Sequence, residues 1–423
     1  MRVLAREVAS HEGATITVAG WVHRIRELGS VSFVLLRDRS GIVQLVYEGK
    51  VEQTLESVIR VTGTCAANEK APGGFEVRAE RTQLLAAAQP ELPLSVNGSL
   101  DEVGLETLLD HRLVALRNPK VRSIFHVQSE ILRAFGEVMR GEGFTEIKSS
   151  KLIGTGTEGG TGLFEVQYFE DSVYLAQSPQ FYKQAMVASG MERVFEIGTA
   201  YRAEKHDTPR HLNEYVSLDV EMGFIESESE LMDLELRILG AVFEAVSATH
   251  PDVLEEYGRS LPTAEALSAT PRISHDEAKA LIKERTGTRA FEINPEGERV
   301  LCDWAAEEHG VEAVFVYGFP RRKRPFYTYP DGQKTKSFDL LFRGLEITTG
   351  GLRIHDYDML RETLPKFKLT EEGMADYLEI FKYGCPPHGG FAIGLERLTQ
   401  KILGLENVKQ AALFPRDRKR TRP

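Results

Sequence analysis

Two arginines far apart in the sequence constrain the fold of this chain most strongly. Arg202 lies in Arg202-Ala203-Glu204, where a strand-like segment ends, and a polar loop then leads to a second apolar segment at 215–221. Arg397 ends the run Gly394-Leu395-Glu396-Arg397 near the C-terminus. A guanidinium stays charged at any working pH and forks onto phosphate oxygens. The sequence therefore predicts a β-hairpin with an arginine and a carboxylate at its tip, and two arginines that suit the two ends of a triphosphate.

The composition is that of a folded chain with more than one domain. With 423 residues and 42% hydrophobic content, two globular domains are expected and disorder is not. No apolar run approaches the roughly 18 residues of a membrane helix, and the N-terminus has no signal-peptide pattern. Cys65, Cys302 and Cys385 are widely spaced and form no CxxC pair, which is typical of reduced thiols. We expect a cytoplasmic protein that is not attached to a membrane.

The net charge of −11 does not exclude a nucleic-acid partner, because the charge is unevenly distributed. Residues 1–97 contain 11 basic and 11 acidic residues, whereas residues 416–422 are strongly basic. Local basic patches can bind RNA even when the whole protein is acidic.

The first part of the chain predicts a small β-barrel. Segments rich in Val, Ile, Leu and Phe alternate with Gly, Asn, Ser and Pro. The expected strands are 14–22, 31–37, 41–47, 58–64 and 75–79. About five strands in about 75 residues suit a Greek-key barrel of the oligonucleotide-binding (OB) type. The alternative is a similar barrel without a nucleic-acid role.

The rest of the chain predicts an α+β domain built on an antiparallel sheet flanked by helices. A Pro-containing linker is expected near 90–98, and apolar residues recur at helical spacing over 121–140. Strands and helices then mix without regular βαβ alternation. We expect an OB-fold domain at 1–97, a hinge at 98–120 and a second domain at 121–423.

Three further segments carry polar residues suited to binding a small charged molecule. A Gly-rich loop at 154–160 holds Glu158, and the run 177–184 carries an amide, Gln180, three residues before Lys183. A surface loop and a capped surface helix are the alternatives. In the third segment, 338–353, strand alternation sets Asp339 and Glu346 on opposite faces, so they can meet only across a bend or through an ion. Structural salt bridges are the alternative there.

Arg202-x-Glu204 and the Gly394–Arg397 run resemble motifs 2 and 3 of class II aminoacyl-tRNA synthetases. Taken with Gln180 and Lys183, the whole chain resembles the short, archaeal-type aspartyl-tRNA synthetases. The resemblance implies ATP-dependent attachment of L-aspartate to tRNA(Asp) through an aspartyl-adenylate, and a homodimer. It also implies that the N-terminal barrel binds the anticodon.

The resemblance implies a role for each matching residue. The ATP-binding residues are Arg202, Glu204, Arg210, His211, Leu212, Tyr215, Glu346, Gly394 and Arg397. The aspartate-binding residues are Glu158, Gln180, Lys183, Arg202, Thr349 and Arg353. Arg202, Glu346 and Arg397 are the implied catalytic residues. Mg²⁺, which prefers hard oxygen ligands, is implied to bind Asp339, Glu346 and Thr349 together with ATP.

In the barrel, the resemblance implies that Phe33 stacks on the central anticodon base, the alternative being a core residue. Arg26, Gln44 and Glu76 are implied to read base edges.

The chain departs from the family pattern at two places. Ser150 replaces the proline of motif 1, the motif that forms the dimer interface. The second place is in the barrel, where the resemblance implies Trp and Lys in the strictly tRNA(Asp)-specific members. This chain has His23 and Pro72 at these positions. The smaller imidazole and proline should relax the requirement for the correct third base of the aspartate anticodon. We therefore expect charging of tRNA(Asn) as well. The misacylated product would then require an amidotransferase.

Other interpretations are a strictly discriminating aspartyl-tRNA synthetase and an asparaginyl-tRNA synthetase. Lys183 argues against asparagine, because a cation suits a carboxylate and not an amide. An asparagine synthetase of the same fold would lack the barrel. A non-catalytic relative would usually lack one of the two arginines, Arg202 or Arg397, and both are present.

Overall fold

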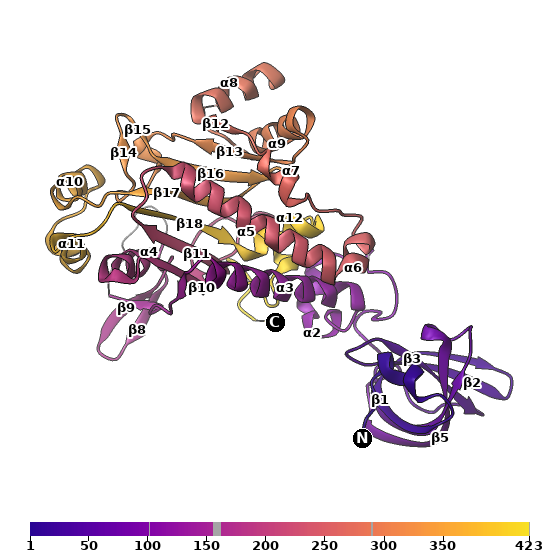
Figure 1. Cartoon of the computed structure of the whole chain (residues 1–423). Helices are drawn as coiled ribbons and strands as arrows, with labels where there is room; N and C mark the ends of the chain where they lie inside the picture. Colours follow the sequence, from indigo (N-terminus) through magenta and orange to yellow (C-terminus); the bar gives the residue numbers. More distant parts are fainter. Residues whose placement is uncertain (101, 155–161, 289–290, 423) are drawn as a thin grey trace. The chain divides into compact units, whose positions relative to one another are not determined.

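The computed structural model (Figure 1) describes residues 1–100, 102–154, 162–288 and 291–422. The chain divides into two compact units, Met1–Asn118 and Pro119–Pro423. Each unit has its own hydrophobic core.

The first unit is built on a closed five-stranded barrel. Its strands are β1 (Thr15–Leu28), β2 (Val31–Arg37), β3 (Ile42–Glu48), β4 (Val58–Ala67) and β5 (Phe75–Ala86). They follow one another around the barrel in the order β1-β2-β3-β5-β4, and only β3 and β5 pair in parallel. Alternate apolar residues such as Val34, Leu36 and Leu45 point inward and are buried. The predicted five-stranded OB-type barrel is therefore confirmed, with β1, β4 and β5 longer than expected.

The linker after the barrel packs against the short helices that follow it. Leu94 and Val96 form a small apolar cluster with Ala115. The helices are α1 (Leu105–Asp110) and α2 (Arg112–Ala115). This segment, predicted to be a hinge, has a core of its own within the first unit.

The second unit is built on an eight-stranded sheet in the order β12-β13-β16-β17-β18-β11-β10-β6. The strands are β6 (Thr145–Glu146), β10 (Arg193–Tyr201), β11 (Glu214–Gly223), β12 (Arg272–Ser274), β13 (Ala313–Tyr317), β16 (Ser337–Phe342), β17 (Leu345–Arg353) and β18 (His388–Gly394). The predicted antiparallel sheet is correct for its centre. At the two edges the sheet is mixed, because β6 pairs with β10 and β12 with β13 in parallel.

The helices that pack against this sheet include α3 (Pro119–Gly141), α5 (Glu228–Thr249), α9 (Pro295–His309) and α12 (Leu395–Leu403) (Figure 1). In α3 the buried residues Ile124, Val127, Ile131 and Phe135 recur every three or four positions, which gives the helix one apolar side. Helix α5 begins with a capping box in which Ser227 and Glu230 each satisfy a backbone N–H of the first turn.

Smaller elements complete the second unit. They are the strands β7 (Leu152–Ile153), β8 (Glu165–Tyr168), β9 (Asp171–Leu175), β14 (Pro330–Asp331) and β15 (Lys334–Thr335), with the helices α4 (Gln180–Met186), α6 (Pro251–Glu256), α7 (Ala264–Ser268), α8 (His275–Thr286), α10 (Tyr357–Thr363), α11 (Ala375–Lys382) and the 3₁₀ turn η7 (Val408–Ala411).

The segment containing Asp339 and Glu346 is a hairpin rather than one strand. Strands β16 and β17 are joined by Arg343 and Gly344, whose φ angles of 49° and 72° are left-handed. A two-residue turn of this kind matches the natural twist of paired strands. The bend that the sequence allowed as one option is thus present, and Asp339 lies opposite Thr349 in the pairing.

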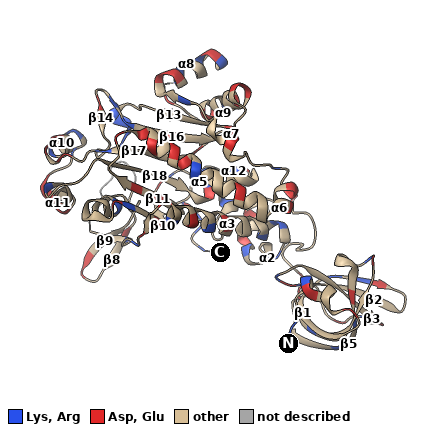
Figure 2. Cartoon of the chain, in the orientation of Figure 1, with Lys and Arg blue, Asp and Glu red and all other residues tan. Residues whose placement is uncertain are grey.

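Charged residues of both signs are mixed along the helices of the second unit (Figure 2). Within the described ranges, no helix is both long and apolar enough to span a membrane.

Glu235 on α5 is a fully buried carboxyl group. Its side chain is 0% exposed, and the polar side chain that interacts with it is that of Thr348 on β17. Burial raises the pKa of Glu235 to about 8. Because the folded state holds this proton more tightly than the unfolded chain does, the stabilisation is complete below the ordinary glutamate pKa. It is lost as the pH rises toward 8.

We expect Glu235→Gln to remove this loss of stability. At about pH 8.5 the variant should have a Tm several degrees above the wild type, whereas at about pH 5 the two should agree. Thermal unfolding at both pH values measures the difference. Glu244→Gln, an exposed position on the same helix, serves as the control. Equal Tm values for Glu235→Gln and wild type at pH 8.5 would contradict a buried neutral Glu235.

Candidate active site

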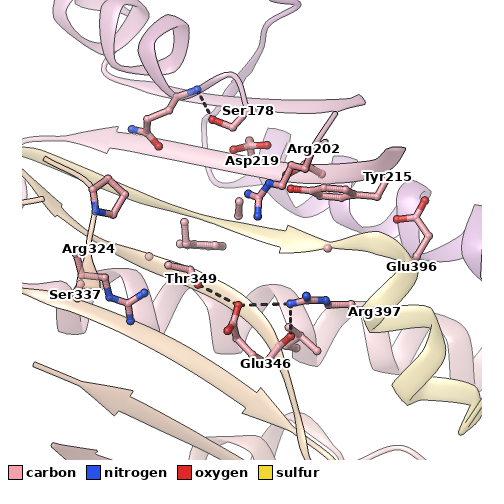
Figure 3. A pocket seen from close by; sticks show the side chains of 18 of the residues that line it. Ser178, Arg202, Tyr215, Asp219, Arg324, Ser337, Glu346, Thr349, Glu396 and Arg397 are labelled. Carbon is pink, nitrogen blue, oxygen red and sulfur yellow. Dashed lines mark hydrogen bonds and ion pairs between the residues drawn. The ribbon is translucent and has the colours of Figure 1, made fainter. Parts of the chain in front are cut away.

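One cavity in the second unit gathers most of the residues that the sequence singled out (Figure 3). Its volume is about 1230 Å³, part of it open to solvent. The predicted residues that line it are Gln180, Lys183, Arg202, Glu204, Arg210, His211, Leu212, Tyr215, Glu346, Thr349, Arg353, Gly394 and Arg397. These residues come from segments spread over more than half of the chain, and the central strands of the sheet bring them together.

The register of the sheet aligns four side chains in one row, of which Asp219, Ala392 and Thr349 line the cavity and Asp339 does not. Asp219 on β11 pairs with Ala392 on β18, Ala392 pairs with Thr349 on β17, and Thr349 pairs with Asp339 on β16. Cross-strand partners point to the same face of a sheet. The methyl group of Ala392 keeps the middle of the row open, while the polar side chains lie at its two sides.

At the β11 side of the cavity, two cations and two carboxylates form a buried network. Lys183 Nζ lies 3.1 Å from Asp219 Oδ1 and 3.3 Å from Glu221 Oε2. Arg353 Nε donates to Glu221 Oε1 at 3.0 Å. Burial alone would raise the pKa of Glu221, but Arg353 and Lys183 overcome that effect and lower it. The Glu221 carboxylate is therefore compensated by the two cations that contact it.

Two features of this network suit a small zwitterion. Gln180 bridges Arg353 and Glu221 at 3.3 and 3.4 Å, which fixes the amide orientation. Asp219 Oδ2 is buried without a hydrogen-bond partner among the described residues, so it can accept a hydrogen bond from a ligand. Gly390 makes room for the network, because a Cβ at that position would lie 2.2 Å from Glu221 Oε2.

At the other side of the cavity, Arg202 and Arg397 lie on opposite walls (Figure 3). The Arg202 guanidinium lies over the ring of Tyr215, 5.4 Å from its centroid. Arg397 Nη1 donates to the Glu346 backbone carbonyl at 3.1 Å and lies 3.5 Å from its carboxylate. Both guanidinium groups can therefore bind phosphate oxygens of a ligand held between them.

The loop between β10 and β11 is held in place by residues from distant segments. Arg397 Nε donates to the Arg210 carbonyl at 3.2 Å, and Arg210 pairs with Glu298 of α9 at 2.8 Å. The pKa of His211 is lowered by burial and by Arg397, so His211 is neutral at pH 7. Its Nδ1 lies 2.6 Å from Thr208 Oγ1.

The proposed magnesium ligands lie on the adjacent strands β16 and β17. Thr349 Oγ1 donates to Glu346 Oε1 at 3.3 Å. Asp339 is buried beside Arg324, at 2.8 Å, and burial raises its pKa to about 7. Among the residues described here, no group of three or more His, Cys, Asp or Glu side chains could hold a metal ion. Two carboxylates, a hydroxyl and ligand phosphates nevertheless form a donor set that fits Mg²⁺, although Asp339 Oδ1 is the oxygen that pairs with Arg324 in this structure.

Residues of the site that were not predicted from the sequence include Asp219, Glu221, Glu298 and Arg324. Asp219 follows Tyr215 and Ser217 on the cavity face of β11, so strand alternation within the predicted hairpin could have identified it. Glu298 accepts from the Glu346 backbone N–H at 3.1 Å and comes from a remote helix. Arg324 lies in an irregular segment, its guanidinium 3.7 Å from the Phe319 ring centroid. No local pattern indicates either of these two. Glu158 lies outside the described residues.

On the barrel, four predicted RNA-binding residues lie on neighbouring strands. Arg26 pairs with Phe33 across β1 and β2, and Gln44 pairs with Glu76 across β3 and β5. Gln44 Nε2 donates to Glu76 Oε2 at 3.0 Å. Phe33 is partly exposed and does not belong to the buried barrel core, so the alternative of a core residue is wrong.

The two residues predicted to govern tRNA discrimination differ in exposure. His23 is 7% exposed, and its Nδ1 lies 2.8 Å from Nη1 of buried Arg37, which itself pairs with Glu56. Pro72 is exposed in the turn between β4 and β5. Pro72 is therefore accessible to a ligand of the barrel, whereas His23 is tied to an internal ion pair.

Comparisons with known proteins agree with this architecture. Residues 104–418 match the family described as tRNA synthetases class II (D, K and N), and residues 16–85 match the OB-fold nucleic acid binding domain. The chain thus belongs to the class II aminoacyl-tRNA synthetases, which are ATP-dependent ligases.

Within this class, the names of similar proteins point to a narrower group of enzymes. The Aspartate--tRNA(Asp/Asn) ligase of Deinococcus radiodurans is 48% identical, with 100% of this chain and 99% of the relative covered. The ligase of the same name from Thermus thermophilus is 47% identical, with both chains covered fully. The solved asparaginyl-tRNA synthetase of Pyrococcus horikoshii with asparaginyl-adenylate is 30% identical, with a TM-score of 0.93 and both chains covered fully.

Glu298 gives a test of the ATP side of the site, measured with aspartate present as the amino-acid substrate. We expect Glu298→Gln to raise the KM for ATP by about tenfold, because Arg210 loses its ionic partner and the Glu346 N–H loses a charged acceptor. ATP–pyrophosphate exchange measures this KM. Glu296→Gln, exposed in the first turn of the same helix, should leave it unchanged. The same KM in both variants would show that Glu298 does not support the site.

Proposed function

We propose that this protein attaches L-aspartate to tRNA(Asp) and to tRNA(Asn) in two steps. Aspartate first attacks the α-phosphate of ATP, which gives aspartyl-adenylate and pyrophosphate. A terminal ribose hydroxyl of the tRNA then takes the aspartyl group and AMP leaves. The observation that carries the proposal is the buried Lys183–Arg353 network at one side of a cavity whose other side holds Arg202 and Arg397.

The aspartate end of the cavity explains the choice of amino acid. Lys183 and Arg353 supply cations for the side-chain carboxylate, and the unpaired oxygen of Asp219 accepts from the α-ammonium. Glu158 is proposed to bind the α-ammonium group as well, and Gln180 is proposed to hold the substrate beside the network. An asparagine side chain would offer these two cations a neutral amide in place of a carboxylate, so it would gain less electrostatic stabilisation than aspartate does.

The ATP end of the cavity carries the catalysis by positioning and charge. Arg202 binds the α-phosphate and the attacking carboxylate, and Arg397 binds the γ-phosphate. Tyr215 stacks under the adenine, and Glu204 accepts from its amino group. Arg210, His211 and Leu212 cover the nucleotide, and Gly394 leaves room for it. No residue acts as a covalent nucleophile, because the substrate carboxylate itself attacks.

Magnesium is the proposed cofactor, and Asp339, Glu346 and Thr349 would hold it together with the phosphates. When bound, Mg²⁺ would neutralise charge on the β- and γ-phosphates. Glu346 also orients Arg397 through its backbone carbonyl, so this residue serves both the metal and the arginine.

The barrel is proposed to bind the anticodon, with residues 1–97 as the binding domain and 121–423 as the catalytic domain. Phe33 offers a partly exposed ring for stacking on a base, and Arg26, Gln44 and Glu76 lie on neighbouring strands with groups for base edges.

Charging of tRNA(Asn) is supported by the names of the Deinococcus and Thermus relatives and by the residues at 23 and 72. A misacylated Asp-tRNA(Asn) would have to be amidated before use, which implies an amidotransferase in the same compartment. We further propose a cytoplasmic homodimer, as the family resemblance implies.

The two-tRNA activity is tested by aspartylation of purified tRNA(Asp) and tRNA(Asn) transcripts with labelled aspartate. We expect charging rates within about tenfold of each other. Pro72→Lys, alone and with His23→Trp, should reduce charging of tRNA(Asn) far more than charging of tRNA(Asp). The single Pro72→Lys variant is the sharper probe, since His23 contacts the buried Arg37. Charging of tRNA(Asp) alone by the wild type would contradict the relaxed specificity and retain the aspartate ligase.

Amino-acid selection is tested by Lys183→Ala and Lys183→Arg. We expect Lys183→Ala to raise the KM for aspartate at least tenfold more than the KM for ATP, and to narrow the preference for aspartate over asparagine. Because the change leaves Asp219 and Glu221 without one cation, Tm must be measured in parallel. Lys183→Arg keeps the charge and should retain the preference. Unchanged selection by a folded Lys183→Ala variant would refute the assignment of this pocket.

A further inference from the structure

We infer that the segment after helix α12, residues 408–419, positions the ATP-binding loop, and that Lys409 is the central positioning residue. The inference rests on the proposed function, because it assigns the loop between β10 and β11 to ATP.

The loop has little structure of its own. Residues 202–213 contain no helix or strand, and the two ends are joined by Arg202 N–H donating to Asn213 O at 2.8 Å. Asn213 Nδ2 donates back to Arg202 O at 2.6 Å and to Glu204 O at 3.1 Å. These bonds fix the base of the loop and leave its middle to be held by other segments.

The middle of the loop rests on η7 and on the segment that follows it. Val408 N–H donates to Pro209 O, and Asn213 N–H donates to Arg416 O, both at 2.8 Å. Leu212 packs with Val408 and Ala412 in an apolar cluster, with Tyr215 against it. Backbone and apolar contacts thus attach the loop to the segment at two points.

Lys409 adds an ionic attachment between them. Its Nζ lies 2.9 Å from Asp207 Oδ1 in the loop and 2.7 Å from Asp417 Oδ2 in the segment. The Lys409 side chain is 8% exposed and the Asp417 side chain 5%. Burial lowers the pKa of Lys409, but the two carboxylates outweigh burial and raise it. Lys419, which is exposed, also approaches Asp207 at 3.3 Å.

The buried ammonium group of Lys409 therefore links a carboxylate of the loop to a carboxylate of its own segment. Lys409 and Asp207 are 202 residues apart in the sequence. Asp207 does not line the cavity, whereas Arg210, His211 and Leu212, a few residues further along, do. A loop released from Lys409 would sample conformations in which these three residues no longer cover the nucleotide. ATP binding would then weaken, and the aspartate network on α4, β11 and β17 would be unaffected.

The test uses Asp207→Ala, which removes the loop end of the link and leaves the buried Lys409–Asp417 pair intact. We expect the KM for ATP in ATP–pyrophosphate exchange to rise about tenfold, the KM for aspartate to stay within about twofold, and the Tm to stay within about 2 °C. Asp276→Ala is the matched control, because Asp276 pairs with exposed Lys334 at 2.6 Å on a helix outside the cavity. It should change neither KM.

Lys409 itself is tested by Lys409→Met and Lys409→Arg. Lys409→Met should reproduce the selective rise in the KM for ATP, and Lys409→Arg should restore it to near wild type, because arginine can bind both carboxylates. If Lys409→Met fails to fold, the double variant Lys409→Met/Asp417→Asn removes the unpaired buried charge. That double variant should again raise the KM for ATP selectively.

Limited trypsin cleavage after Lys205 and Arg210 reports on the loop without requiring activity. We expect cleavage several-fold faster in Asp207→Ala than in wild type and in Asp276→Ala. An unchanged KM for ATP in folded Asp207→Ala and Lys409→Met variants, or equal rises in both KM values, would overturn the inference. Absence of aspartate-dependent exchange in the wild type would instead overturn the proposed function, and the cleavage assay would still decide the role of Lys409.

Discussion

The site depends on a compensated set of four buried charges at the centre of the sheet. Lys183, Arg353, Asp219 and Glu221 lie almost entirely out of water, and burying any one of them without a partner would cost several kcal/mol. Paired as they are, they form a rigid array with one unused oxygen. The sheet register and Gly390 maintain that geometry. Affinity for a charged amino acid is thus prepared before the ligand arrives, because the reorganisation has been completed by folding.

Much of the architecture could be predicted from local patterns. Alternation of apolar residues identified all five barrel strands, and the spacing in α3 identified the helix that supports the second unit. The motif residues predicted for ATP and aspartate line one cavity, apart from Glu158, which is not described. Such residues occupy short runs whose chemistry is readable without a fold. For the segment 338–353 the sequence left open whether a bend brings Asp339 and Glu346 together, and the structure shows that Arg343 and Gly344 form this bend.

Other features could not be read from the sequence, because they depend on pairing between distant segments. The row of Asp219, Ala392, Thr349 and Asp339 exists only in the register of four strands. Glu298 contacts Glu346 and Arg210 from a helix that looks like an ordinary amphipathic surface helix in sequence. The parallel pairing at both sheet edges likewise follows from crossover connections and has no local signature.

The attachment of the loop at 202–213 to residues 408–419 also has a consequence for local stability. The loop contains no helix or strand and is held by a few contacts, so it belongs to the part of the fold that opens at the lowest free-energy cost. Partial unfolding would then free the nucleotide loop while the central strands stay paired. Mild heating or denaturant would therefore produce a state in which the sheet is intact but the nucleotide is bound only weakly.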